Sequence, residues 1–175
     1  MNVIIANRQR IKKINLRLLR QIAQALLAEL KIENAELGIN LVGAKEMANI
    51  NWQFLRHEGS TDVITFDYSE RVVQASRLHK KSLKREIRRR DACATLCGEF
   101  FICVDEAVLQ ARKFKTDWQS EIVRYIVHGV LHLLGHRDLK PDLRRKMKLE
   151  ENRLLRGLSR KFSLAQIARR SKISA

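Results

Sequence analysis

The sequence has no apolar run that approaches the roughly 18 residues of a membrane-spanning helix. The apolar run at residues 3–6 is too short for the core of a signal peptide, and basic residues follow it instead of preceding it. These absences favour a cytoplasmic protein that has no membrane partner. We also expect no dinucleotide cofactor.

Cysteine is scarce, with only Cys93, Cys97 and Cys103 in the chain. In a cytoplasmic protein these residues are expected to be free thiols. Cys93 and Cys97 form a CxxxC pair, but no second pair with zinc-finger spacing follows it. A zinc site built on cysteine is therefore disfavoured.

Acidic residues are also few, because 19 Asp and Glu stand against 35 Lys and Arg. The net charge is +16 and the sequence pI is near 10.4. Such an excess of positive charge is best balanced by a polyanion. Nucleic acid is the first candidate, since binding to phosphates releases condensed counterions. A membrane surface is the second candidate and an acidic protein the third.

The length of 175 residues predicts a single domain with a sizeable core. Hydrophobic periodicity divides the chain into short strands followed by a series of helices. Asn15 and Asp117 are suited to cap two of these helices. The expected strands cover residues 3–6, 36–42, 63–66 and 100–104, and the expected helices cover residues 15–31, 44–55, 105–113, 117–134 and 140–156.

Two basic segments stand out from this pattern, an insert at residues 71–95 and a tail at residues 159–175. The domain itself is expected to span residues 1–158. The insert is either a basic helix or a disordered loop, and it forms either a solvated surface or a contact with RNA phosphates. Its candidate RNA-binding residues are Lys80, Lys81, Lys84, Arg85, Arg88, Arg89 and Arg90.

The clearest chemical signal is a pair of histidines in the helix expected at 117–134. His128 and His132 are four residues apart, so both imidazoles project from one helix face and can reach one metal ion. Gly135 suits a left-handed position at the end of the helix and lets the chain turn back. Asp138 can then supply the third ligand, and His136 is its alternative.

The order His-x-x-x-His-x-x-Gly-x-x-ligand matches the spacing of the metzincin motif. A metalloprotease would carry its general-base Glu next to the first histidine, but this chain has Gly129 there. The motif also has Asp138 where the third histidine would stand. A metallopeptidase is therefore disfavoured, although a metal-dependent hydrolase is not.

The residues around the histidines resemble a known family. Residues 128–135 are similar to the signature HGxLHLxG of the YbeY family of ribosomal RNA maturation factors. Residues 61–66 resemble that family's TDVLSF strand, and residues 98–102 its GDI-type strand. Residues 51–56 resemble the segment that carries the family's functional arginine. The matches follow the family's order, but the family ends its motif Gly-Tyr-Asp-His, whereas this chain has Gly-His-Arg-Asp.

The resemblance implies an α+β fold with a small mixed β-sheet flanked by helices. It also implies a zinc-dependent single-strand endoribonuclease with one Zn²⁺ per chain. The substrate would be the precursor of 16S ribosomal RNA, processed at its 3′ end, with a link to the small ribosomal subunit and to ribosome quality control. Carried over by position, His128, His132 and Asp138 are metal ligands and Arg56 is the functional arginine.

A general base remains to be identified, since residue 129 is glycine. Asp62 and Glu99 are candidates near strand ends. Asp62 could alternatively orient a ligand imidazole by accepting a hydrogen bond from its second nitrogen. A competing hypothesis is an RNA-bound ribosome assembly factor without catalysis. Its metal would be structural and held by four protein ligands, for example with His136 and Asp138 both bound. No zinc-finger, RRM or KH pattern supports a pure nucleic-acid-binding module.

Overall fold

The structure, a computed structural model, describes residues 1–69 and 96–169. The basic insert and the last residues of the tail lie outside the described residues. In chain order the elements are β1 (Asn2–Asn7), α1 (Leu16–Glu29), β2 (Ala35–Val42), α2 (Ala44–Leu55), β3 (Val63–Asp67), β4 (Leu96–Cys103), α4 (Val104–Phe114), α5 (Trp118–Leu133), α6 (Pro141–Lys161) and the 3-10 helix η1 (Leu164–Ile167).

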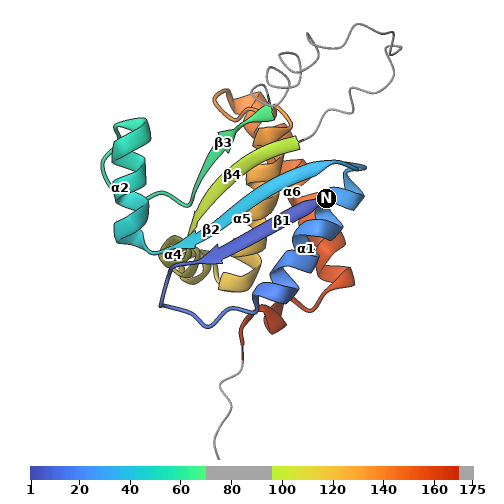
Figure 1. The fold of residues 1–175 in the computed structure, drawn as a ribbon, viewed down its shortest axis with the longest axis horizontal. Coiled ribbons are helices and arrows are strands. Elements are labelled where there is room, and N and C mark those ends of the chain that lie inside the picture. The colour runs from blue at the N-terminus through green and yellow to red at the C-terminus, as the bar shows by residue number, and fades with distance from the viewer. Residues whose placement is uncertain (70–95, 170–175) are drawn as a thin grey trace, which may run out of the picture.

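The described strands form one mixed sheet in the order β1-β2-β4-β3. β1, β2 and β4 run parallel, and β3 pairs with β4 in the antiparallel direction. Figure 1 shows α5 and α6 behind this sheet, with α2 set apart at one side. The expected α+β fold with a small mixed sheet flanked by helices is therefore confirmed.

Helix α5 is the centre of the fold. Its buried residues lie all around its circumference, because it packs against β3 and β4 on one side and against α4 and α6 on others. Residues from α1, α5 and α6 join the inward residues of the sheet in one hydrophobic core. A smaller cluster under α2 covers one end of the opposite face, where Met47 packs with Val42, Ile64 and Cys103.

Two glycines allow α5 to lie very close to β4. A Cβ atom built on Gly98 of β4 would lie 2.6 Å from both Cδ atoms of Leu133 and 2.9 Å from the carbonyl oxygen of Phe66. A Cβ atom on Gly129 of α5 would lie 3.1 Å from the ring of Phe100. Gly129 thus faces the sheet, which explains in packing terms why this position carries no side chain.

The helix-capping prediction is correct for one residue and incomplete for the other. Asn15 caps α1, since its side-chain oxygen accepts a hydrogen bond of 3.2 Å from the backbone N–H of Leu18. Asp117 occupies the N-cap position of α5, but its side chain makes no capping hydrogen bond.

Two elements are longer than their sequence patterns indicate. β4 begins at Leu96 instead of residue 100, because backbone pairing with β2 continues through Cys97, Gly98 and Glu99. These three residues give no strong strand signal of their own. α6 continues to Lys161 instead of residue 156, since Leu158 is buried one turn after Leu154.

The packed part of the chain also extends beyond residue 158. Leu164 and Ile167 of η1 are buried in the main core. The backbone N–H of Asn15 donates to the carbonyl of Ile167 over 2.8 Å, and Ile14 forms a bridge with Ala168. Residues 159–169 of the expected basic tail are thus part of the folded domain. Within the described residues, none of the helices has the length and apolarity that crossing a membrane requires.

We predict that Gly98→Ala destabilises the protein by about 1–3 kcal/mol, because the added methyl overlaps Leu133 and the backbone of Phe66. The matched control is Gly157→Ala in α6, where an added Cβ atom meets nothing within 4 Å. That change should stabilise the helix by up to about 1 kcal/mol. Urea unfolding curves measure both effects, and equal unfolding midpoints would refute the close approach of α5 to β4.

Candidate metal centre

The turn after α5 brings its C-terminal residues back toward the helix. α5 ends at Leu133, and Gly135 has a φ angle of +85°. The N–H of Gly135 donates to the carbonyl of His132 over 2.9 Å, and the N–H of His136 donates to that of Leu131 over 3.0 Å. This is a Schellman motif, and it confirms the left-handed position predicted for Gly135.

His128, His132 and Asp138 come together at this turn. The Nε2 atoms of the two histidines are 2.9 Å apart, and an Asp138 oxygen lies 3.9 Å from the Nε2 atom of His132. One potential ligand atom from each residue lies within 4.8 Å of the other two. Within residues 1–69 and 96–169, these three side chains are therefore the candidates for a metal site built from His, Cys, Asp or Glu.

The hydrogen bonds of the two imidazoles fix which nitrogen faces the centre. The Nδ1 atom of His132 lies 3.0 Å from the carbonyl oxygen of His136, which can only accept, so this nitrogen carries the proton. The Nδ1 atom of His128 lies 2.5 Å from a carboxylate oxygen of Glu151 and donates to it in the same way. The two Nε2 atoms therefore face each other across the centre. Two imidazole nitrogens and a carboxylate form a donor set that fits a divalent metal ion.

The pKa values of the two histidines move in opposite directions. Burial alone lowers the pKa of His128, but the hydrogen bond and charge of Glu151, with Asp62 and Asp138, outweigh burial and raise it. The pKa of His132 is lowered, first by burial and then by the charge of His128. The difference between the two rings follows from the hydrogen bond that Glu151 makes with His128.

Glu151 of α6 was not anticipated from the sequence. It is only 8% exposed, and it orients His128 from the side opposite the metal group. Its position does carry a signal, because it follows Met147 by four residues and precedes Leu154 by three, on the buried face of α6. A carboxylate on an otherwise apolar face requires a partner, and His128 is that partner.

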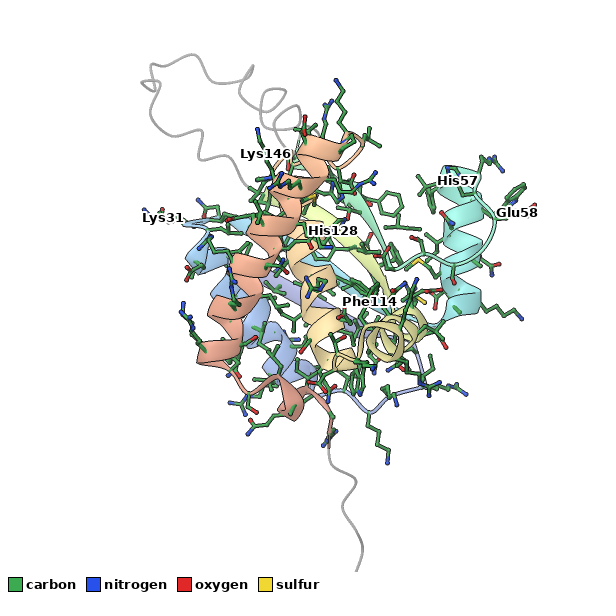
Figure 2. The ribbon with its side chains drawn as sticks, turned by 180° about the vertical axis from the view of Figure 1, so that it is seen from behind. Lys31, His57, Glu58, Phe114, His128 and Lys146 are labelled. Atoms are coloured by element: carbon green, nitrogen blue, oxygen red, sulfur yellow. The ribbon has the colours of Figure 1, made fainter. Side chains whose placement is uncertain are left out.

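The three potential ligands lie where two surface hollows meet. His128, Asp138 and Asp62 line both hollows. The first hollow extends along α6 and is otherwise lined by Arg124, Tyr125, Arg144, Met147, Lys148 and Glu151. The second extends along β3 and is otherwise lined by Leu55, Thr61, Val63, Ile64, Thr65, Asp67, His132 and Leu133. In Figure 2, His128 projects from α5 beside α6.

The family model described as endoribonuclease YbeY matches residues 2–159 of this chain. The chain belongs to the YbeY endoribonuclease family. This membership confirms the family that the sequence motifs indicated.

Individual YbeY relatives cover different shares of the chain. A protein named endoribonuclease YbeY from Chlorobium phaeovibrioides is 35% identical over 116 residues, which are 66% of this chain and 64% of the relative. The chain thus spans slightly less than two thirds of that relative. A protein of the same name from Thermobifida fusca is 30% identical over 161 residues, 91% of this chain and 96% of the relative.

A solved structure also resembles the whole chain. The solution structure of a Thermotoga maritima protein superposes with a TM-score of 0.60 and covers 99% of both chains at 19% identity. This likeness supports the fold of the YbeY family member described here.

Other sequence-predicted residues lie farther from the metal group. Arg56 ends α2 in a left-handed conformation, and its guanidinium lies 6.0 Å from the ring centre of Trp52. It lines neither hollow, whereas the preceding Leu55 lines the second. His136 is exposed and lines a separate hollow with Arg137 and Lys146. The seven basic residues predicted to bind RNA in the insert lie outside the described residues.

The two candidates for a general base differ in where they lie relative to the metal group. Asp62 lines both hollows, while its Oδ1 atom accepts hydrogen bonds from the N–H of Val63 and the hydroxyl of Thr61. Glu99 does not lie there, because it alternates along β4 with Gly98 and Phe100, which face α5. It binds the side chain of Asn40 instead, over 2.7 Å. Asp62 is therefore the candidate that the structure places at the metal group.

We predict that Glu151→Ala weakens binding of divalent metal by about 10–100-fold, because His128 loses the carboxylate that orients it. Glu151→Gln should retain part of the affinity, since an amide oxygen can still accept from the Nδ1 atom. The matched control is Glu150→Ala, which removes an ion pair with exposed Arg153 instead. Isothermal titration with Zn²⁺ measures the three affinities, and a loss shared equally by the Glu150 and Glu151 variants would contradict the assignment.

Proposed function

We propose that this protein is a metal-dependent endoribonuclease that cuts single-stranded RNA in the 3′-end maturation of 16S ribosomal RNA. The convergence of His128, His132 and Asp138 at the meeting point of two hollows carries the proposal. The family and its relatives named endoribonuclease support RNA as the substrate. The net charge of +16 is consistent with a polyanionic partner.

The metal in this proposal is one Zn²⁺ per chain, held by His128, His132 and Asp138. Two imidazoles and a carboxylate form a donor set that zinc accepts, and three protein ligands are typical of catalytic zinc sites. When bound, such an ion supplies Lewis acidity and makes water more acidic. We further propose that the protein acts in the cytoplasm with the small ribosomal subunit and contributes to ribosome quality control.

The protein's own residues position the groups for hydrolysis. A water oxygen forms a new bond to the phosphorus atom, and the bond from phosphorus to the leaving ribose oxygen breaks. Asp62 accepts the proton from that water and returns a proton to the leaving oxygen. Arg56, at the end of α2 next to the second hollow, pairs with the phosphate and stabilises the charge on its oxygens.

The alternative proposal of a non-catalytic assembly factor requires a closed site with four protein ligands. His136 would be the fourth ligand, but its side chain lines a different hollow. The described residues thus offer three donors and favour an open site. A metallopeptidase is supported still less, because Gly129 is packed against Phe100 and offers no base.

We predict that the purified protein holds about one metal ion per chain, as a three-ligand site does, and cuts precursor 16S ribosomal RNA. His132→Ala and Asp138→Ala should lose both the metal and the cleavage. His136→Ala is the control and should keep both, because its side chain lies outside the metal group.

Elemental analysis and a gel assay of RNA cleavage measure these properties together. If the metal is bound and RNA is never cut, the assembly-factor alternative replaces the endoribonuclease proposal. If His136→Ala loses the metal and Asp138→Ala does not, then the third ligand is His136.

We also predict that Arg56→Ala lowers kcat/KM for RNA cleavage by roughly 100-fold, the loss typical of one donor to transition-state charge. Arg56→Lys should recover only part of this, since ammonium cannot bind two phosphate oxygens side by side. Arg20→Ala, on the exposed face of α1, is the control for the loss of one positive charge. Identical kinetics for the Arg56 and Arg20 variants would remove Arg56 from the site.

A further inference from the structure

The first hollow carries three cationic side chains beside the metal group, Arg124 from α5 and Arg144 and Lys148 from α6. None of them belongs to the signature around the histidines. Their charges lie next to Asp62, His128 and Asp138, where a substrate phosphate has to approach. The three cations differ in how far their charge is already neutralised within the protein.

Arg124 is largely engaged within the protein. Its Nε atom lies 3.3 Å from a carboxylate oxygen of Glu121, and its Nη1 atom donates to the side chain of Asn152 over 2.9 Å. The same nitrogen lies 3.9 Å from Glu151, the carboxylate that orients His128. Arg124 therefore pairs with Glu121 and lies near Glu151, which orients His128, and these carboxylates offset most of its positive charge.

Arg144 is only partly engaged. Its Nε atom donates a hydrogen bond of 3.1 Å to the main-chain carbonyl of Asp138, which helps to fix the turn that carries this potential ligand. No described carboxylate lies within ion-pair distance of its guanidinium. The two terminal nitrogens thus remain able to bind oxygens of a ligand in the hollow.

Lys148 is exposed and has no carboxylate partner among residues 1–69 and 96–169. This distinguishes it from Arg153 and Lys161 on the same helix, which pair with Glu29. Lys148 follows Arg144 by four residues, so the two side chains lie on one face of α6, one turn apart. Their spacing suits a single phosphate group held between them.

We propose that Arg144 and Lys148 form a phosphate-binding subsite for single-stranded RNA on α6, beside the metal group. This subsite rests on the proposed function. It adds to that function a path for the RNA backbone, which would run along α6 through the first hollow. The ligand is a phosphodiester adjacent to the bond that is cut. Arg144 also has a second role, since it holds the main chain of Asp138.

Lys148→Ala tests the subsite without disturbing the metal group. We expect it to raise the dissociation constant for RNA about fivefold, the upper range for one exposed ion pair. The effect should be similar for different RNA sequences. The slope of log K against log salt concentration should fall by about 0.7, the value for one phosphate contact on a single strand. The affinity for metal should stay unchanged. The variant Lys148→Arg keeps the positive charge and should bind RNA as the unchanged protein does.

Lys146→Ala is the matched control. It removes the same charge from the same helix, but Lys146 lines the separate hollow that contains His136. Figure 2 shows Lys146 apart from His128. We expect no change in the salt slope for this variant. Arg144→Ala should weaken both RNA binding and metal binding, because it loses the phosphate contact and the bond to Asp138.

Fluorescence anisotropy with a labelled single-stranded RNA, run beside a cleavage gel, separates the outcomes. If Lys148→Ala behaves like Lys146→Ala while the unchanged protein binds and cuts RNA, the subsite is refuted and the proposed function stands. If Lys148→Ala weakens RNA binding as expected but the unchanged protein cuts no RNA, the phosphate-binding subsite stands and the endoribonuclease proposal fails. If the unchanged protein does not bind RNA, both proposals fail.

Discussion

The contact between α5 and β4 is the constraint on which the rest of the structure depends. Gly98 admits the side chain of Leu133, and Gly129 admits the ring of Phe100, so helix and strand approach closely at both points. With Gly129 turned to the sheet, the neighbouring His128 and His132 lie on the flank of the helix. That flank faces Asp62, which immediately precedes β3, and Glu151 of α6. The site is thus assembled from elements that this packing holds in place.

Carboxylates and cations line the same hollow beside the metal group. Glu151 and Asp62 flank the histidines, and Asp138 contributes a further negative charge. A carboxylate in place of a third imidazole leaves a bound divalent ion with one positive charge fewer to present to RNA. The cations of α6 lie where they offset this difference. In the proposed function the acidic groups serve the metal ion, and in the proposed subsite Arg144 and Lys148 serve the phosphates.

The sequence predicts the part of the site that is local. His128, His132, Gly135 and Asp138 fall within eleven residues, so helical spacing and one turn are enough to bring them together. The helical pattern places Glu151 on the buried face of α6, but the partners of Glu151 and Arg144 depend on how α6 packs against α5, which no local pattern encodes. Glu99 illustrates the reverse case, because its place near a strand end indicates nothing about which sheet face it occupies. The register of β4 decides this, and that register is set by β2.

The pairing of Ile14 with Ala168 joins two segments that are more than 150 residues apart in the chain. Because α1 begins immediately after this bridge, the cap of the first helix includes backbone from η1. A chain still emerging from the ribosome cannot form this contact until residue 168 has left the exit tunnel. Completion of the core therefore depends on a contact between distant segments, and contacts of such long range slow the final folding step.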